Sequence, residues 1–149
     1  MTITPFFWFD GQAEEAAAFY CSIFKDSRIT SKSPGPNGKP MTVAFELNGR
    51  PFVALNGGPQ FKFTEAISMM ITCETQAELD SYWEQLLSGG GQESMCGWLK
   101  DRFGLSWQVV PAGLGKLMSQ PDPEKSQRVM KALLSMRKLI IADLERAAG

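Results

Sequence analysis

An order of local patterns that occurs twice is the feature of this sequence that most constrains its fold. In each copy a strand-like run precedes a helical pattern, and three further strand-like runs follow it. The first copy covers about residues 3–58 and the second about residues 65–111. No residue-level repeat accompanies this order, so the succession of elements alone indicates an internal duplication. The sequence therefore predicts an α+β protein built from two β-α-β-β-β modules.

The first module contains the strongest hairpin signal of the chain. Its predicted segments are a strand at 3–9, a helix at 12–24 and strands at 28–32, 41–47 and 51–56. Asn48-Gly49 lies between the last two strands and favours a two-residue turn, because both residue types accept positive φ. The prolines and glycines of residues 33–40 break any regular ladder, so this stretch is predicted to be a loop.

The second module begins its helix with a capping box. Its predicted segments are a strand at 66–73, a helix at 75–87 and strands at 92–96, 98–100 and 105–110. Thr75 with Glu78 three residues later indicates the start of the helix. Gly89-Gly90-Gly91 indicates its end.

A second hairpin is predicted at Asp101-Arg102-Phe103-Gly104, where an Asp side chain can bond the backbone two residues on and Gly can take positive φ. On the returning strand, side chains alternate between the two faces of the sheet. One face carries Leu105, Trp107 and Val109, and the other carries Ser106, Gln108 and Val110. The first face suits a covering helix, and the hydroxyl and amide groups of the second suggest either the lining of a cavity or an ordinary half-exposed face.

The 149 residues fit one compact domain. Beyond residue 111 the pattern becomes helical, and Asp122-Pro123-Glu124 is typical of a helix start. We therefore expect a single domain, 1–149, with the modules at about 3–58 and 65–111 and a helical extension at 112–149. The extension is too apolar to stay free, so it is expected to pack on the sheet or on another subunit.

Charge and hydropathy argue against several kinds of partner. Fifteen Lys and Arg residues against sixteen Asp and Glu residues give a net charge of -1, which provides no field for steering toward nucleic acid or an anionic membrane. No apolar run approaches the roughly 20 residues that cross a bilayer, and Met1-Thr2-Ile3-Thr4-Pro5 lacks the basic start of a secretory signal. We expect a cytoplasmic protein without nucleic-acid or membrane partners.

The chain contains three cysteines and no histidine. Cys21, Cys73 and Cys96 are odd in number and far apart, which disfavours a disulfide framework or a zinc cluster and favours free thiols. The absence of histidine excludes nucleophilic triads that use a His base, and it removes the commonest transition-metal ligand. Any acid–base chemistry is left to carboxylates, Tyr, Lys or water.

Several motifs together resemble the vicinal oxygen chelate superfamily, also called glyoxalase/bleomycin resistance/dioxygenase, and most closely its 3-demethylubiquinone-9 3-methyltransferase-like branch. The motifs are residues 3–11, Ala13-Glu14-Glu15-Ala16 with Phe19-Tyr20, Leu55-Asn56-Gly57-Gly58, Thr75-Gln76-Ala77-Glu78, residues 96–111 and Pro121-Asp122-Pro123-Glu124-Lys125. The resemblance implies two β-α-β-β-β modules that form a cupped mixed sheet around a cavity, with C-terminal helices added here. It also implies a homodimer.

The resemblance implies metal positions that this chain does not fill. Metal-using members commonly have two His and two Glu, and the corresponding places fall near Thr4, Ala54, Ser68 and Gln108. None of these is a His or a carboxylate, so we expect no catalytic metal. The alternative uses improvised carboxylate ligands, for which the candidates are Glu46, Glu65 and Glu74. S-adenosylmethionine, which the branch name implies, is not expected either, because no Gly-rich strand-to-helix turn is present, and no cofactor is therefore predicted.

With the cup taken from the resemblance, its expected lining is apolar and aromatic with a few neutral polar groups. The candidate residues are Phe6, Trp8, Ala54, Asn56, Ser68, Met70, Ser106 and Gln108. Such a pocket suits a small, partly aromatic molecule. The first hypothesis is metal-independent binding or sequestration. The second is an enzyme acting on an aromatic or quinone-like compound, and the third is a structural protein whose C-terminal helices form a dimer interface. The sequence leaves the choice open, with Cys73 as the simplest catalytic suspect.

Overall fold

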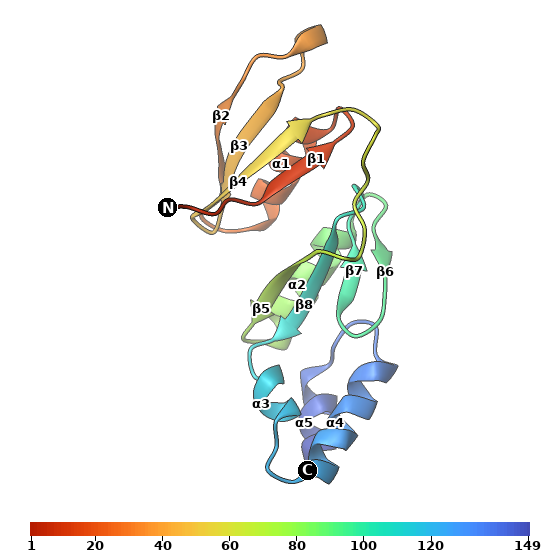
Figure 1. Ribbon diagram of the computed structural model, residues 1–149. Helices are drawn as coiled ribbons and strands as arrows, with labels where there is room; N and C mark the ends of the chain where they lie inside the picture. The colour runs from red at the N-terminus through yellow and green to blue at the C-terminus, as the bar shows by residue number, and fades with distance from the viewer. The chain divides into compact units, whose positions relative to one another are not determined.

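The computed structural model describes residues 1–149, which form two compact units at 1–63 and 64–149 (Figure 1). The first unit contains one four-stranded mixed sheet with a helix on one face. Its elements are β1 (Phe6–Phe9), α1 (Ala13–Ile23), β2 (Arg28–Lys32), the short 3-10 helix η1 (Pro36–Gly38), β3 (Thr42–Leu47) and β4 (Arg50–Asn56). The strand order is β1-β4-β3-β2, in which only the β1–β4 pair is parallel.

The core of the first unit lies between this sheet and α1. Tyr20 of α1 is fully buried and packs against the ring of Phe45, which in turn stacks on Phe52. Phe7 and Phe9 of β1 are buried on the same face because side chains alternate along the strand. The alternate residues of β1, Phe6 and Trp8, therefore lie on the open face.

The second unit repeats this arrangement. Its elements are β5 (Ser68–Cys73), α2 (Gln76–Leu87), β6 (Gln92–Glu93), β7 (Trp98–Lys100) and β8 (Ser106–Pro111), followed by α3 (Leu114–Met118), α4 (Pro123–Ser135) and α5 (Ile141–Ala148). The strand order is β5-β8-β7-β6, and again the first pair alone is parallel. Leu105, Trp107 and Val109 are buried, as predicted. Ser106 and Val110 on the other face are buried too, so that Gln108 alone of that face is half-buried. The predicted fold class of mixed α+β modules with C-terminal helices is thus confirmed.

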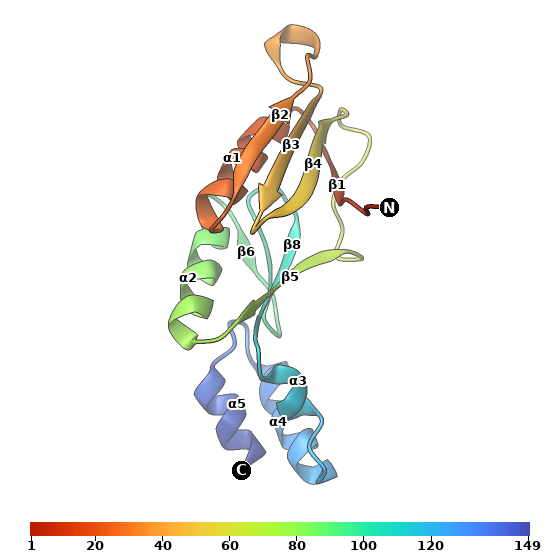
Figure 2. The ribbon, with the colours of Figure 1, turned by 90° about the vertical axis from the view of Figure 1, so that its left-hand side faces the viewer.

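Within the second unit, the C-terminal extension is attached to the β-α-β-β-β module by backbone and side-chain hydrogen bonds. The Gln76 amide at the start of α2 donates to the carbonyl of Leu139 at 3.0 Å and accepts from the amide of Ile141 at 2.8 Å. The amides of Cys96 and Gly97 donate to the carbonyls of Met136 and Arg137 at 2.7 and 2.8 Å. The helices α3, α4 and α5 lie together beyond the end of β8 (Figure 2).

Several element boundaries differ from the predicted ones for local reasons. β1 begins at Phe6 rather than residue 3, after a proline that cannot donate to a ladder. β6 has two residues rather than five, because the chain turns through Cys96 and Gly97 at φ of 61° and 82° and bonds the extension there. The predicted loop contains η1, and the sequence analysis did not identify α3.

Two further observations bear on the class of protein. None of the helices has both the length and the apolar character that a membrane crossing requires. The three cysteines are free, with Cys73 buried and Cys21 and Cys96 half-buried. That the whole chain forms one domain stays a prediction.

Candidate functional site

The open face of the first sheet is aromatic. Phe6 remains 59% exposed, and Trp8 is half-buried beside it on β1. The Trp8 indole is fixed in place, because its Nε1–H donates to the carbonyl of Gly58 at 2.8 Å. The Phe61 ring stands edge-on to the indole with 4.9 Å between centroids. Two of the predicted lining residues, Phe6 and Trp8, therefore share an apolar surface with Phe61, which the sequence analysis did not identify.

Ala54 and Asn56, the other two predicted residues of this module, lie on the opposite face. Ala54 is fully buried and pairs with Phe7, whose side chain is also buried. The Asn56 side chain accepts from the amide of Ala13 at 2.9 Å and donates to the carbonyl of Pro40 at 2.8 Å. It therefore holds the start of α1 and the end of the loop, and the structure does not bring Ala54 or Asn56 together with Phe6 and Trp8.

The Asn56-Gly57-Gly58 stretch is explained by this geometry. A side chain at Gly57 would bring its Cβ within 2.4 Å of the Trp8 ring, so only glycine lets the chain pass beneath the indole. Gly58 has a φ of 97°, and its carbonyl accepts the indole N–H. The stretch that follows β4 is thus built around Trp8.

The open face of the second sheet is polar where β5 and β8 meet. Ser68 pairs with Ser106 and Met70 with Gln108, so these four predicted residues lie on one face. The Gln108 Nε2 donates to the Ser68 hydroxyl at 2.8 Å. Ser106 is 1% exposed, and its hydroxyl is buried without a hydrogen-bond partner. Such an orphan is rare, because a buried hydroxyl is normally paired with protein or water.

An ion pair adjoins these residues at the end of β7, next to the hairpin. Lys100 of β7 pairs with Ser106 across the hairpin, and its ammonium group forms an ion pair with Glu65. The Lys100 hydrogen bond is the main reason that the pKa of Glu65 lies below its ordinary value. Sequence reasoning did not include Lys100, although its register across the predicted Asp101 turn would have placed it beside Ser106.

Asp101 supports this region from within the hairpin. The carboxylate is 3% exposed and accepts from the amides of Phe103 and Leu105 at 2.8 and 3.1 Å through one oxygen. Its other oxygen accepts from the Trp107 indole at 2.9 Å. The buried charge is therefore well satisfied, and it fixes the turn that positions Ser106 and Gln108.

The residues present do not fit the metal that the fold family implies. Nowhere do three His, Cys, Asp or Glu side chains converge so as to hold a metal ion. Two of the improvised candidates have other partners: Glu46 bonds Arg28 at 3.2 Å and Glu65 bonds Lys100. A neutral amide and hydroxyl such as Gln108 and Ser68, already bonded to each other, are poor ligands for a first-row transition metal.

Cys73 does not have the properties of a nucleophile. Its side chain is fully buried, and burial, with a smaller contribution from the charge of Glu78, raises its pKa to about 11. Nucleophilic cysteines instead have lowered pKa values and partial exposure. The thiol is therefore protonated at neutral pH and serves as a small apolar group.

An adenosine cofactor does not fit the two strand-to-helix turns either. The turn before α2 is Glu74-Thr75, with the Thr75 hydroxyl accepting from the amide of Glu78 at 3.2 Å and the Glu78 carboxylate accepting from the amide of Glu74 at 2.8 Å. The turn before α1 contains one glycine, Gly11, rather than a glycine-rich loop on a parallel sheet.

Comparison with known proteins shows which family this chain matches. The family model described as 3-demethylubiquinone-9 3-methyltransferase matches residues 1–110. A solved structure of a PhnB protein from Bacillus cereus, whose description carries the same family name, is 35% identical with a TM-score of 0.70, and the match covers 75% of this chain and all of that one. No protein with a curated description matches the chain.

More distant structures share the fold. Protein PA1353 from Pseudomonas aeruginosa is 20% identical with a TM-score of 0.61, covering 74% of this chain and 97% of that one. The fosfomycin resistance protein FosX from Listeria monocytogenes, solved with Mn(II) and sulfate, is 14% identical with a TM-score of 0.53, covering 72% of this chain and 86% of that one. At these identities the likeness concerns the fold alone.

Proposed function

Since this chain belongs to the 3-demethylubiquinone-9 3-methyltransferase family, a branch of the vicinal oxygen chelate superfamily, we propose that it binds a small, partly aromatic molecule on a sheet face without a catalytic metal. The observation that carries the proposal is the Ser106 hydroxyl, which is buried and unpartnered. A polar group in such a position is stabilised when a ligand or an ordered water supplies the missing hydrogen bond.

The residues around Ser106 determine which chemical groups a ligand should carry. The bonded pair of Gln108 and Ser68 and the ammonium group of Lys100 supply further polar groups on the same face. Met70, 63% exposed, supplies an apolar surface beside them. A ring that carries a hydroxyl or carbonyl group would use both kinds of contact, because small-molecule sites combine apolar walls with a few convergent polar groups.

The test is a titration with catechol, which can form a hydrogen bond with the Ser106 hydroxyl, and with toluene, which cannot. Catechol is expected to bind, and Ser106→Ala is expected to weaken it about fivefold, the value of one net hydrogen bond. Ser94→Ala removes an exposed hydroxyl elsewhere in the module and serves as the matched control. Equal binding of catechol and toluene, or an unchanged affinity in Ser106→Ala, would contradict the proposal.

Metal independence has its own test. Because no three ligand side chains converge, incubation with a chelator should leave catechol binding unchanged. Soaking with nickel, zinc or manganese should give no stoichiometric ion on either sheet. A tightly bound ion on either sheet would contradict metal independence.

The second candidate function is an enzyme acting on a quinone-like or aromatic substrate, favoured by the family name of the matching model. In this alternative Gln108 and Ser68 would orient the substrate. Incubating bound phenols with and without S-adenosylmethionine and analysing the mixture by mass spectrometry distinguishes the two functions. A methylated or rearranged product supports the enzyme, and unchanged phenol supports binding alone.

We also propose a homodimer as the functional state. Large apolar side chains are exposed in both units. In the first unit Ile3 is 86%, Phe6 59% and Phe61 66% exposed, and in the second Ile67 is 63% and Leu134 59% exposed. Burying such side chains against a second copy is favourable in proportion to the apolar area removed from water. Light scattering after size exclusion should give twice the 16.5 kDa chain mass, and a monomer at all concentrations would contradict this state.

A further inference from the structure

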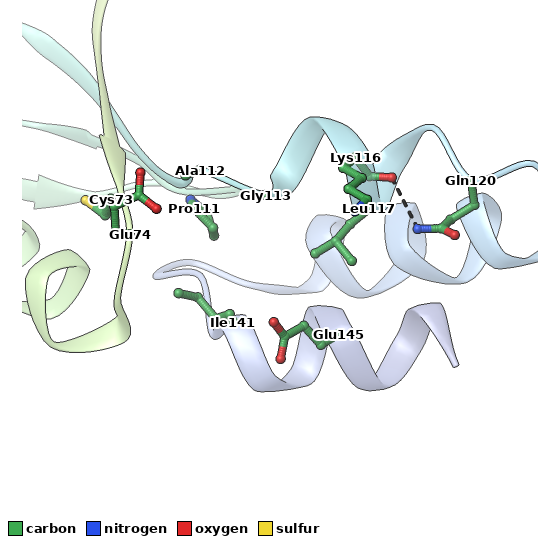
Figure 3. A pocket seen from close by; sticks show the side chains of 10 residues that line it. All are labelled: Cys73, Glu74, Pro111, Ala112, Gly113, Lys116, Leu117, Gln120, Ile141 and Glu145. Atoms are coloured by element: carbon green, nitrogen blue, oxygen red, sulfur yellow. Dashed lines mark hydrogen bonds between the residues drawn. The ribbon is translucent and has the colours of Figure 1, made fainter.

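A pocket lies within the second unit, at the ends of β5 and β8 and between α3 and α5. Its volume is about 320 Å³, near the lower limit for sites that hold small molecules. Figure 3 shows Glu74 at the end of β5, Leu117 on α3, and Ile141 and Glu145 on α5 around it, whereas the sulfur of Cys73 points away from the two helices. This pocket is separate from the open face that carries Ser106.

The walls of the pocket are held in place by hydrogen bonds on several sides. The amide of Ala112 donates to the carbonyl of Cys73 at 2.9 Å, which joins the two strand ends. The Gln76 side chain bonds both Leu139 and Ile141 and so fixes the start of α5. A ligand would therefore enter a preformed space and lose little free energy in ordering it.

The inner surface of the pocket is apolar. Pro111 and Cys73 are buried at its strand end, and Leu117 and Ile141 are half-buried between the helices. The ligand thus needs a short apolar body.

Three charged side chains surround this surface: Glu74, Lys116 and Glu145. All three are exposed, and the six ion pairs of the structure involve other residues. Two carboxylates against one ammonium group give the lining a formal charge of -1. An exposed carboxylate gains modestly from an ammonium partner, and two of them around one apolar space select for a positive charge.

We propose that this pocket binds a small organic cation, a primary amine on a short aliphatic chain, with its ammonium group between Glu74 and Glu145 and its chain against Leu117 and Ile141. Lys116 and Glu145 belong to the extension, which lies outside residues 1–110 that the family model matches. The site therefore depends on this extension together with Glu74, and it is independent of the proposed binding on the sheet face.

The experiment is an NMR titration of the full chain with n-butylamine, n-butyrate and n-butanol, which share one carbon skeleton and differ in charge. Butylamine is expected to give saturable shifts at the amides of Ala112, Gly113 and Ile141, and the other two are expected to give none at the same concentrations. Saturation by butyrate or butanol with similar affinity, or no saturation by butylamine, would overturn the proposal.

Charge variants then test the assignment of the residues. Glu145→Gln and Glu74→Gln are each expected to weaken butylamine about two- to fivefold, and Lys116→Gln to strengthen it by a similar factor. Glu84→Gln, which removes an exposed charge on α2 outside the pocket, is the matched control. All four positions are exposed, so the fold should be kept, which a spectrum of each variant checks. An unchanged affinity in both glutamate variants, or an equal loss in Glu84→Gln, would overturn the proposal.

Discussion

The two modules share one strand order but carry different chemistry on their open faces. In the first module the open face presents Phe6 and Trp8, and in the second it presents Ser68, Ser106 and Gln108. The faces that meet the helices are alike, since both are apolar and buried. The comparison teaches that the helix-facing positions define the frame, whereas positions of opposite parity are free to diverge.

The modules also differ in the polar group that organises each of them. Asn56 is a neutral amide that ties a loop to the start of α1, and Asp101 is a buried carboxylate that closes a hairpin. The Asp101 contacts are the costlier ones to break, because a carboxylate forms stronger hydrogen bonds than an amide and two of its three N–H partners are buried.

The largest expected effect follows from this difference. Asp101→Ala should lower the free energy of unfolding by about 3 to 4 kcal/mol, since it leaves the Trp107 indole and two backbone amides without their acceptor. Urea unfolding measures the change. Asp10→Ala, at an exposed Asp of the first module, should cost less than about 0.5 kcal/mol, and similar costs for both would refute the distinction.

The next effect concerns the thiols at alkaline pH. The pKa of Cys73 is raised from 9.0 to about 11, so the unfolded chain ionises first as pH increases. The stability contributed by the neutral thiol is complete below pH 9 and is lost between pH 9 and 11, by about 2 to 3 kcal/mol in total.

Unfolding of the wild type and of Cys73→Ala, measured from pH 8 to 11, should show this loss in the wild type and less of it in the variant. Cys21 of the first module is only half-buried, and burial also raises its pKa. Cys21→Ala should therefore change the pH dependence less than Cys73→Ala, and the reverse order would contradict the assignment.

Asn56→Ala should cost about 2 kcal/mol, because it removes the acceptor for the Ala13 amide and the donor to Pro40. Asn56→Asp keeps the acceptor at the start of α1, where a negative charge is favourable, but it sets a carboxylate oxygen against the Pro40 carbonyl, so it should cost less than Asn56→Ala without being neutral. Thermal or urea unfolding distinguishes the two variants, and a larger loss in Asn56→Asp would mean that the contact with Pro40 outweighs the one with Ala13.

The smallest effect should have the opposite sign. Ser106→Ala removes a hydroxyl without a partner, so stability should be unchanged or rise by up to about 1 kcal/mol. Ser33→Ala in the first module removes a hydroxyl that lies 2.7 Å from the Thr42 hydroxyl and accepts from the Thr42 amide at 3.0 Å, and it should cost about 1 kcal/mol. A marked loss of stability in Ser106→Ala would show that its hydroxyl is already satisfied.

The sequence predicts best where polar and apolar residues alternate. The strand after Asp101 shows this alternation, and its buried face was predicted correctly. Residues 51–56 have no such contrast, since Val53, Ala54 and Leu55 are all apolar, and the resemblance then assigned Ala54 and Asn56 to a cavity although they lie on the helix-facing side. The short β6 could not be anticipated, because contacts of Cys96 and Gly97 with distant carbonyls end it.

The cytoplasmic location, the partners and the lining of a shared cavity stay predictions.

The capping box illustrates how far local reasoning reaches. Thr75 caps the helix as expected, but the Glu78 side chain accepts from the amide of Glu74 rather than from that of Thr75. The unpaired state of Ser106 and the pocket beside α5 depend on packing between distant segments, which no local pattern encodes.

Gln76 gives the molecule a mechanical property. Its amide holds residues on both sides of the turn into α5, and it belongs to the first turn of α2. A tension applied to the C-terminus would therefore load these two bonds early, whereas β5 and β8 would be strained only after the extension had peeled away. Under force the C-terminal extension should therefore detach before the sheet unfolds.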